Sequence, residues 1–403
     1  MGRRYHSVRR LYRQPILRVL FALFLLCDTL HILNIYWTQA AARRSPPPPR
    51  NTRRIYIAAQ HWNTARVLRE RWNNSLVALI KELGIENVYV SIYESGSYDD
   101  TKDVLRELDA TLGELQVKRT ISLSDVSHKD EITKQPGDHG WIKIPSGDIA
   151  LRRIPFLANL RNQVLQPLET LSSQGHLYDT VLFLNDVVFT PQDVLRLLDT
   201  NGGSYGAACS LDFSNPPYFY DTFALRDSNG HEAVMQTWPY FRSYTSRYAA
   251  ERLLPVPVAS CWNGMVAMRS EPFLTPSPLR FRGIPDSLGS YHLEGSECCL
   301  IHADNPQSAT RGVFLNPMVQ VGYNGTAYDV VHSKSAEISA FGIYTAIWEN
   351  RIRRWTTSPL FKESVVHSRV KKWRKKDPAR EERGEFCLVN EMHVLHENGW
   401  RHV

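Results

Sequence analysis

Several nucleotide-binding and catalytic signatures are missing from this sequence. It has no glycine-rich loop of the P-loop or dinucleotide-binding type and no G-x-S-x-G turn, which argues against kinases, dehydrogenases and α/β-hydrolases. Cysteines are few, six in 403 residues, and the adjacent pair at 298–299 has no second close pair, so the spacing does not predict a zinc finger. With 22% charged and 43% apolar residues, the composition is that of a globular chain.

The net charge of +7 is distributed unevenly along the chain. Residues 1–54 contain eleven arginines and one acidic residue, a net charge of +10, so the remaining 349 residues carry −3. A mildly acidic body argues against a nucleic-acid-binding face. The Lys/Arg-rich segment 370–383 is interpreted as a solvated basic stretch or tether, in preference to a site for an acidic polysaccharide.

The basic leader is interpreted as part of a membrane anchor. Ile16 to Trp37 is a run of 22 mostly apolar residues, close to the ~20 that a helix needs to cross ~30 Å of hydrocarbon. Asp28, His31 and Asn34 are unusual in such a span, and a cleaved signal peptide is the alternative. Six arginines lie before or just inside the span and only two lie close behind it, so the positive-inside rule predicts a cytoplasmic tail at 1–15 and a luminal body, the topology of a type II membrane protein.

A stalk and a folded luminal domain are expected after the anchor. The four consecutive prolines in segment 38–53 favour an extended polyproline spacer, which leaves residues 54–403 as the folded domain. Two sequons, at Asn73 and Asn324, are compatible with a glycosylating lumen. Five cysteines lie outside the anchor, so we expect one or two disulfides plus a free thiol, with the pairing left open.

The folded domain begins with strands that alternate with helices. Apolar or β-rich runs predict strands at 54–59, 87–93, 118–123 and 180–189, and helical spacing predicts helices at 63–83, 99–115 and 151–172. This alternation predicts an α/β fold with a parallel sheet covered on both faces. Because ligands of such sheets bind at the carboxyl ends of the strands, the chemistry is expected at 94–101 and at Asn185-Asp186.

Asn185-Asp186 is the most informative pair in the sequence. An aspartate that ends a buried strand beside a second oxygen ligand is typical of a site that holds Mg²⁺ or Mn²⁺ against a diphosphate. The pair therefore predicts a metal site centred on Asp186. The alternative is that the pair caps the helix that follows at 191–199, although Thr190 before Pro191 already suits that role.

Two further segments place acidic residues or glycine where a site could form. Glu294 and Glu297 are three residues apart at the start of a predicted helix, a position that the helix dipole also favours for acids without any catalytic role. Asn263-Gly264 predicts either a hairpin turn between two apolar strands or a glycine that lets backbone amides approach a ligand.

The segment 210–227 combines carboxylates with aromatic residues. Asp212, Asp221 and Asp227 lie among several Phe and Tyr residues. Aromatic faces beside carboxylates suit sugar recognition, because the rings stack on the sugar and the acids bind its hydroxyls. A hydrophobic loop cluster is the alternative interpretation.

Eight sequence blocks between residue 54 and the C-terminus occur in an order that is found in a known family. They are SIYESGSYDDT, RIPFLANLRNQVLQPL, LFLNDVVF, CSLDFSNPPYFYDTFALRD, VPVASCWNGMVAM, LRFRGIPDSLGSYHLEGSECCLIHADN, LNPMVQVGYN and FCLVNEMHVLHENGW. With these blocks the chain resembles the fungal capsule-associated α-1,3-mannosyltransferase family. The resemblance implies a type II Golgi enzyme that transfers mannose from GDP-mannose to a mannose-containing glycan with retention, helped by Mn²⁺ or Mg²⁺. It also implies a GT-A-like fold, which is a nucleotide-sugar-binding mixed sheet flanked by helices.

The resemblance also implies roles for individual residues. Asn185-Asp186-Val187 stands where the family fold keeps a metal-binding D-x-D motif, but its first position is Asn and its third is Val, so the metal would depend mainly on Asp186. His332 would complete the metal site. The remaining implied roles are the donor-sugar loop at Asn263 and Gly264, the acceptor-side acid at Glu294 or Glu297, the pyrophosphate site at Arg161 and Asn162, and the guanosine site at Glu94 and Ser97.

Alternatives stay open for both the mechanism and the function. For a retaining transfer, either Asp212, Asp221 or Glu297 attacks the anomeric carbon, or the acceptor hydroxyl enters on the leaving-group face. The incomplete D-x-D motivates a second function, a membrane-tethered glycan-binding scaffold without turnover. A third alternative is a transferase that uses another sugar nucleotide.

Overall fold

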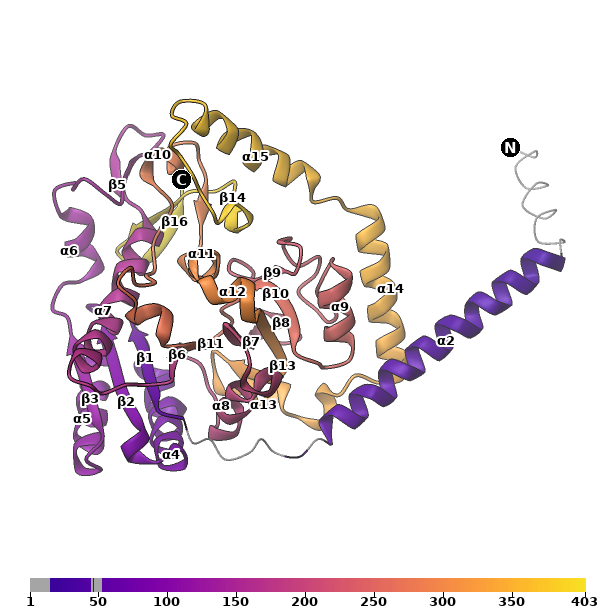
Figure 1. Ribbon diagram of the computed structural model, residues 1–403, viewed down its shortest axis with the longest axis horizontal. Coiled ribbons are helices and arrows are strands. Elements are labelled where there is room, and N and C mark those ends of the chain that lie inside the picture. Colours follow the sequence, from indigo (N-terminus) through magenta and orange to yellow (C-terminus); the bar gives the residue numbers. More distant parts are fainter. Residues whose placement is uncertain (1–14, 45, 47–52) are drawn as a thin grey trace.

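The computed structural model describes residues 15–44, 46 and 53–403. A central sheet carries helices on both faces, and one long helix projects from this body (Figure 1). The predicted cytoplasmic tail, apart from Pro15, and residues 45 and 47–52 of the predicted stalk lie outside the described residues.

The central sheet is mixed and follows the order β3-β2-β1-β6-β11-β7-β13-β10-β9. Its strands are β1 (Ile55–His61), β2 (Val88–Glu94), β3 (Lys118–Leu123), β6 (Thr180–Leu184), β7 (Ala207–Asn215), β9 (Arg226–Asp227), β10 (Val256–Ser260), β11 (Met265–Arg269) and β13 (Val313–Gly322), with β8 (Tyr218–Phe219) paired to β7. Strands β3, β2, β1 and β6 are parallel, whereas β11 is antiparallel to both β6 and β7. The parallel strands predicted from the sequence are confirmed, and so is the mixed, helix-flanked sheet that the resemblance implied.

Two hydrophobic cores lie on opposite faces of this sheet, because successive side chains of a strand point to opposite sides. Ile55 and Ile57 of β1 belong to one core, while Tyr56 and Ala58 belong to the other. The first core is covered by α3 (Ala65–Val67), the π-helical turn η1 (Leu68–Trp72), α4 (Asn73–Leu83), α5 (Thr101–Glu114) and α8 (Pro191–Leu198). The second is covered by α7 (Arg153–Ser173), α9 (Tyr244–Glu251), α11 (Glu297–Asp304) and α14 (Ala340–Thr356).

Smaller elements connect these layers and form the C-terminal part. They are η2 (Ile85–Asn87), α6 (His128–Thr133), β4 (Trp141–Lys143), β5 (Ile149–Leu151), η3 (Thr200–Gly203), η4 (Glu271–Leu274), α10 (Asp286–Gly289), β12 (Glu294–Gly295), α12 (Pro306–Arg311), α13 (Gly325–Val331), η5 (Lys334–Ala336), α15 (Leu360–Arg374), η6 (Glu385–Cys387), β14 (Leu388–Val389), β15 (His393–His396) and β16 (Gly399–His402). Strand β12 pairs with β14, and β15 forms a hairpin with β16. The last residues therefore return to the region of α11.

Helix and strand ends differ from the sequence predictions at two informative places. The strand predicted at 180–189 ends at Leu184, and only Val188 pairs again, as an isolated bridge to Gly322. The helix expected to begin before Glu294 begins at Glu297, because Glu294 lies in β12. In contrast, Thr190 caps α8 in a capping box with Asp193, as predicted, so Asn185-Asp186 does not cap that helix.

The segment between β10 and β11 crosses the sheet and does not form a hairpin. Strands β7 and β13 lie between β10 and β11, which corrects the hairpin interpretation of Asn263-Gly264. A disulfide from Cys261 to Cys209 of β7 ties the crossing segment to the sheet. Gly264 has a φ of 90°, and a Cβ at this position would lie 2.6 Å from Val321 Cγ2, so the crossing requires glycine here.

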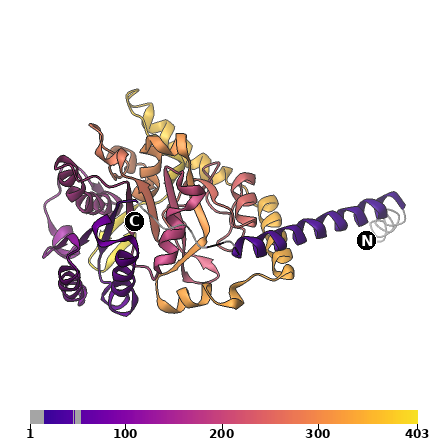
Figure 2. The same cartoon turned by 60° about the horizontal axis from the view of Figure 1, so that its bottom comes forward.

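The long N-terminal helix α2 (Pro15–Arg43) has 29 residues and a mean hydropathy of 2.1 in its most apolar window, which by length and composition is enough to cross a membrane. It continues six residues past the predicted anchor into the predicted stalk. Its N-terminal part extends away from the body, as Figure 2 shows, and its C-terminal part contacts α14. Asp28, the unusual acid in the span, accepts hydrogen bonds from Arg351 Nη1 at 2.5 Å and from Trp348 Nε1 at 2.9 Å.

Two disulfides settle the cysteine pairing that the sequence left open. Cys209 is bonded to Cys261 and Cys299 to Cys387, while Cys27 and Cys298 are free thiols. The first bond holds the crossing segment on the sheet. The second ties the start of α11 to the C-terminal segment that carries β14.

We expect removal of the first disulfide to destabilise the protein. The Cys209–Cys261 bond joins residues 52 apart in sequence, and a loop of that size restricts the unfolded chain by about 4 kcal/mol. The double variant Cys209→Ala/Cys261→Ala should lower the apparent Tm of the full-length protein in detergent by about 5 °C or more. Cys298→Ala, which replaces a buried but free thiol, is the matched control and should change it little. Equal melting of the double variant and the wild type would contradict the expectation.

Candidate active site

A cleft of about 880 Å³ opens at the carboxyl edge of the sheet. Its walls come from the ends of β6 and β13, the loop after β8, helix α7, the start of α11 and the C-terminal segment 389–402. Four of the predicted site residues line this cleft: Arg161, Asn185, Asp221 and Glu297. The fold brings these distant parts of the chain together because the carboxyl ends of parallel strands meet at one edge.

Asn185, the first residue after β6, is tied into the structure by three hydrogen bonds. Its backbone N donates to Gly264 O at 2.9 Å, and its carbonyl accepts from Trp72 Nε1 at 2.9 Å. Its side-chain Oδ1 accepts from Trp262 Nε1 at 3.1 Å. The indole occupies one lone pair of this oxygen, so Asn185 has less to offer a metal than an aspartate would.

Asp186 is the free carboxyl group at this position. It accepts no hydrogen bond from any side chain in the described part of the chain, and burial raises its pKa, while its own backbone N–H and Arg161 act in the opposite direction. Its charge acts on Tyr220 and Tyr323, which both line the cleft. A bound cation would favour the charged form that burial disfavours, so the environment of Asp186 fits a divalent metal ligand.

Asp212 and Asp221 form a coupled pair of carboxyl groups next to Asn263. Asp212 Oδ1 accepts from Asn263 Nδ2 at 2.8 Å and from the backbone N of Asp221 at 3.1 Å. Asp221 Oδ1 accepts from the backbone N of Phe223 and of Ala224, both at 3.0 Å. Burial, and then the charge of Asp221, raise the pKa of Asp212 to about 7, and burial also raises the pKa of Asp221.

One wall of the cleft carries an ion pair that stacks on an aromatic ring, formed by Glu297, Arg161 and Trp262. Arg161 Nε donates to Glu297 Oε1 at 3.0 Å, and the Arg161 guanidinium lies 4.4 Å from the centre of the Trp262 ring. Glu297 is the first residue of α11, where the helix dipole stabilises its charge. The ion pair holds Arg161 at the cleft beside Asn185.

Polar atoms without partners gather at the carboxyl ends of β1 and β2. Glu94 Oε1 accepts from the backbone N of Ser97, and Ser97 Oγ accepts from the backbone N of Asn63 at 2.9 Å. Among the described residues, Glu94 Oε2, Gln60 Oε1 and Ser95 Oγ are buried with no hydrogen-bond partner. Buried polar groups are normally paired, so these atoms are available for a polar ligand. A narrow cavity that borders Gln60 shares Arg161 and Asn185 with the main cleft.

The structure places Glu294 away from the cleft and thereby corrects the prediction that it acts on the acceptor. Its carboxylate is fully buried and binds Arg152, with Nη2 to Oε1 at 2.6 Å and Nε to Oε2 at 3.3 Å. Arg152 also donates to Asp286 Oδ1 at 2.7 Å. Both oxygens of Glu294 are therefore used inside the protein.

Asn162 and His332 are also placed elsewhere. Asn162 Nδ2 donates to Phe281 O at 2.8 Å and its Oδ1 accepts from Phe281 N at 3.0 Å, so it fastens a loop to α7 and does not face the pyrophosphate site. His332 ends α13, with Nε2 3.7 Å from Asp193 Oδ1 and its ring 4.0 Å from that of Tyr328. Asp193 belongs to the cap of α8, so His332 does not complete the metal site at Asp186.

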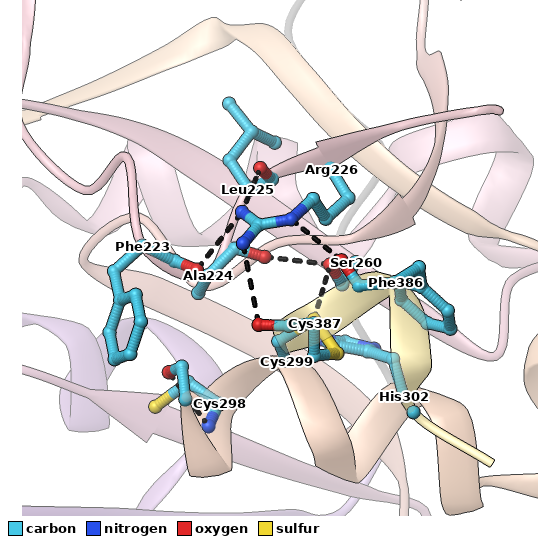
Figure 3. The surroundings of a disulfide bond; sticks show 12 residues. Phe223, Ala224, Leu225, Arg226, Ser260, Cys298, Cys299, His302, Phe386 and Cys387 are labelled. Atoms are coloured by element: carbon cyan, nitrogen blue, oxygen red, sulfur yellow. Dashed lines mark hydrogen bonds between the residues drawn. A yellow bond between two sulfur atoms is a disulfide. The ribbon is translucent and has the colours of Figure 1, made fainter. Parts of the chain in front are cut away.

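Arg226, within the FALRD block, supports the loop that carries Asp221. Its guanidinium is buried and donates to the carbonyls of Leu225, Phe223 and Phe386 at 2.9, 3.1 and 2.8 Å (Figure 3). Nearby, Ser260 Oγ donates to Ala224 O at 2.7 Å. The arginine thus links the loop after β8 to the segment that the Cys299–Cys387 disulfide holds, and its role is structural.

Sequence reasoning missed several residues that line the cleft. Tyr323 directly follows β13, Trp262 precedes the Asn263 turn, and Arg153 begins α7. The C-terminal hairpin adds His393, Trp400 and His402, with Glu391 just before it. The spacing Glu-x-His followed by a further His in this block was a signal that could have drawn attention to the C-terminus.

Comparison with known proteins gives consistent matches. Residues 54–304 match the model of a family described as Cryptococcal mannosyltransferase 1. Over 346 residues, which are 80% of this chain and 70% of the relative, the chain is 25% identical to alpha-1,3-mannosyltransferase CMT1 of Cryptococcus neoformans var. neoformans serotype D.

Among solved structures, the chain is similar to mannosyltransferase PcManGT from Pyrobaculum calidifontis in complex with GDP-Man and Mn²⁺, with 12% identity and a TM-score of 0.36 over 90% of this chain and 87% of that chain. It is also similar to S. aureus TarS 1-349 in complex with UDP, with 11% identity and a TM-score of 0.36 over 80% of this chain and 72% of that chain.

The pKa of Asp212 leads to a pH-dependent stability. Because burial raises it from 3.8 to about 7, the folded state binds more protons than the unfolded state between these values, and stability falls as the pH rises through that window. Asp212→Asn removes this penalty. Its stability relative to the wild type should be greater at pH 8 than at pH 5, by up to a few kcal/mol.

The test compares the apparent Tm of both proteins at the two pH values in the presence of a chelator. Asp125→Asn, at a fully exposed carboxylate, is the control and should show no pH-dependent difference. If the apparent Tm of Asp212→Asn differed from that of the wild type by the same amount at both pH values, the pKa of Asp212 would not be raised.

Proposed function

Since the chain belongs to the family described as Cryptococcal mannosyltransferase 1 and is a glycosyltransferase, we propose that it is a retaining α-1,3-mannosyltransferase. The donor is GDP-mannose and the acceptor is a mannose-containing oligosaccharide or polysaccharide. The reaction takes place in the cleft at the carboxyl edge of the sheet.

The observation that carries this proposal is the position of Asp186. It is a half-buried carboxyl group two residues after a buried strand, it has no side-chain hydrogen bond within the described residues, and its electrostatic neighbours are the cleft residues Arg161, Tyr220 and Tyr323. A structural aspartate would be expected to have its oxygens satisfied, as those of Glu294 are. A carboxyl group left free at a strand end is suited to hold a cation that a diphosphate shares.

The residues present fit one divalent cation held by few protein ligands. Asp186 supplies a carboxylate, and Asn185 Oδ1 supplies at most a weak second oxygen ligand. Mg²⁺ is usually bound in proteins by one or two carboxylates together with substrate phosphates, and this ligand set matches that pattern. When bound, the cation, Mn²⁺ or Mg²⁺, would neutralise charge that develops on the leaving diphosphate.

Two arginines of α7 line the cleft. Arg161 is held in place by Glu297 and Trp262, and Arg153 lies at the start of α7 with its guanidinium 4.3 Å from the centre of the Trp400 ring. Groups that are already oriented toward a developing negative charge lower the barrier without reorganising. Both arginines are therefore assigned to the diphosphate end of the donor.

The guanosine is assigned to the ends of β1 and β2. The buried atoms there without partners among the described residues include Glu94 Oε2, Ser95 Oγ, Gln60 Oε1, His61 Nε2 and Trp62 Nε1, and Ser97 lies in the same loop as Glu94. A purine with amino and ring N–H donors would satisfy the acceptor Glu94 Oε2. The narrow cavity beside Gln60 and Asn185 lies between this position and the cleft.

The acidic residues of the cleft are assigned to the sugar side. Asp221 and Glu297 line the cleft, whereas Asp212 lies behind Asp221 and orients its loop. Retention then proceeds either by attack of one of the two lining carboxylates on the anomeric carbon or by entry of the acceptor hydroxyl on the leaving-group face.

We assign the protein to the Golgi membrane with its body in the lumen. Two disulfides in the domain that follows α2 favour an oxidising compartment, and the arginine-rich leader favours a cytoplasmic N-terminus. Of the two sequons, Asn324 is exposed, while Asn73 Nδ2 donates to Val104 O at 3.4 Å in the packing of α4 on α5. Asn324 is therefore the better glycan acceptor.

The decisive experiment measures sugar transfer by the full-length protein in detergent. With GDP-mannose, a mannobiose acceptor and Mn²⁺, mass spectrometry should detect the addition of one hexose, and a chelator should stop it. Asp186→Ala should reduce the rate by about a hundredfold or more, because it removes a group that stabilises charge in the transition state.

His332→Gln is the matched control, since the structure places His332 outside the cleft, and it should retain the wild-type rate. A fully active Asp186→Ala variant would contradict the assigned metal site. GDP-mannose binding without transfer would point to a different acceptor. A protein that neither transfers nor binds any sugar nucleotide would favour the glycan-binding scaffold.

A further inference from the structure

Three potential metal ligands meet on the C-terminal hairpin. His393 and His402 are directly opposite each other in the β15–β16 pair, and Glu391 lies two residues before His393. One ligand atom from each residue lies within 4.8 Å of the other two. His393 Nε2 is 2.9 Å and His402 Nδ1 is 3.6 Å from Glu391 Oε2.

We propose that Glu391, His393 and His402 bind a zinc ion at the wall of the cleft. Two imidazoles and one carboxylate are a ligand set that zinc uses when three protein ligands leave a fourth position open. All three residues line the cleft, so the fourth position faces its interior. This site is chemically distinct from the one at Asp186, because imidazole selects transition metals while carboxylate and phosphate oxygens select Mg²⁺ or Mn²⁺.

The zinc would fasten the end of the chain to the active site. The hairpin rests on α7 through Leu395, which packs against Phe156 and Leu160, and Val394 bridges to Arg152. Trp400, two residues before the ligand His402, covers the Arg153 guanidinium. A metal that joins both strands at their open end would hold Trp400, and through it Arg153, in position at the cleft. The site does not depend on which sugar nucleotide is the donor.

The test measures metal content directly. The full-length protein in detergent is stripped with a chelator, loaded with Zn²⁺, washed and analysed by mass spectrometry for bound zinc, and Co²⁺ substitution is followed by its visible absorption. The wild type should bind about one zinc per chain. Glu391→Gln and His402→Gln, at side chains that are 47% and 60% exposed, should fold normally and bind zinc at least tenfold more weakly.

Two controls separate this site from others. His396→Gln, at an exposed histidine on the same hairpin outside the cluster, and Asp186→Ala should keep the zinc. The proposal is overturned if the wild type binds no zinc, or if Glu391→Gln and His402→Gln bind zinc as tightly as the wild type. It is also overturned if Asp186→Ala abolishes zinc binding, because His393 would then belong to the metal site at Asp186.

A second inference comes from the way α2 packs on the body. Asp28, Ile32, Ile35 and Gln39 of α2 are buried, with Asp28 bound to α14 and Gln39 Nε2 donating to Glu251 O at 2.9 Å. The free part of α2 before Asp28 has 13 residues, which span about 20 Å of helix and fall short of the ~30 Å of a hydrocarbon core. If α2 crosses the bilayer, part of its packed segment must also enter the membrane, and α14 must enter with it.

We infer that α14 and the start of α15 lie in the interface of the same bilayer. Their outer surface carries large exposed apolar side chains: Phe341 at 75%, Trp355 at 68%, Leu360 at 68% and Phe361 at 82% exposure. Aromatic residues are enriched at this depth of a membrane. This inference depends on the proposed membrane anchoring.

Fluorescence quenching by lipids can test it. The full-length protein, with Cys27→Ser, is reconstituted in phosphatidylcholine vesicles that contain spin-labelled lipid, and a fluorophore is attached through Val19→Cys in α2, Phe361→Cys in α15 or Leu177→Cys between α7 and β6. Labels at 19 and 361 should be quenched, and the label at 177, an equally exposed apolar site on another part of the body, should not. Quenching at 19 but not at 361 overturns the interface and keeps the anchor, whereas no quenching at 19 overturns both.

Discussion

The geometry of the cleft depends on one close backbone contact, the passage of Gly264 over the sheet. A Cβ at this position would lie 2.6 Å from Val321 Cγ2 and 3.4 Å from Asp212 Cβ, so any other residue would push the crossing segment away. Because the segment lies this close, Asn263 reaches Asp212, and Trp262 reaches both Asn185 and Arg161. The Cys209–Cys261 bond holds the beginning of the segment in the same way. One glycine and one disulfide therefore set the positions of residues from four different elements.

In the proposed function, a donor and its cation together balance the charges of the cleft. Burial raises the pKa values of Asp186, Asp212 and Asp221, because each would lose hydration if charged. Arg161 is already neutralised by Glu297. A diphosphate alone would add negative charge beside these acids, and a cation alone would lack most of its ligands. In the proposed function, binding of the two together would satisfy both and would give Asp186 its partner.

Local sequence patterns predicted the sheet and part of the site, and tertiary partners decided the rest. The buried strand before Asn185, the Thr190 cap and the helices at 63–83 and 151–172 follow from nearby residues, and the structure has them. Glu294, Asn162 and His332 were misplaced because their partners Arg152, Phe281 and Asp193 are more than a hundred residues away. The hairpin reading of Asn263-Gly264 failed for the same reason, since a turn signal does not reveal which strands pair. In the C-terminal wall of the cleft, the Glu391-x-His393 spacing was a local signal, but only the fold shows that this segment reaches the cleft.

Helix α14 lies between the long apolar helix α2 and the cleft. Trp348 and Arg351 bind Asp28 of the long apolar helix, while Glu349 and Arg353, on neighbouring positions, line the cleft. The two sets of residues are separated by the width of a single helix, about 10 Å with its side chains. The polar residue that made α2 an imperfect membrane span is thus the one that fixes its angle to the body. If α2 is the membrane anchor proposed above, a cleft this close to it favours acceptors that are presented near the membrane surface, so that this distance constrains the acceptor as well as the residues that touch the sugar.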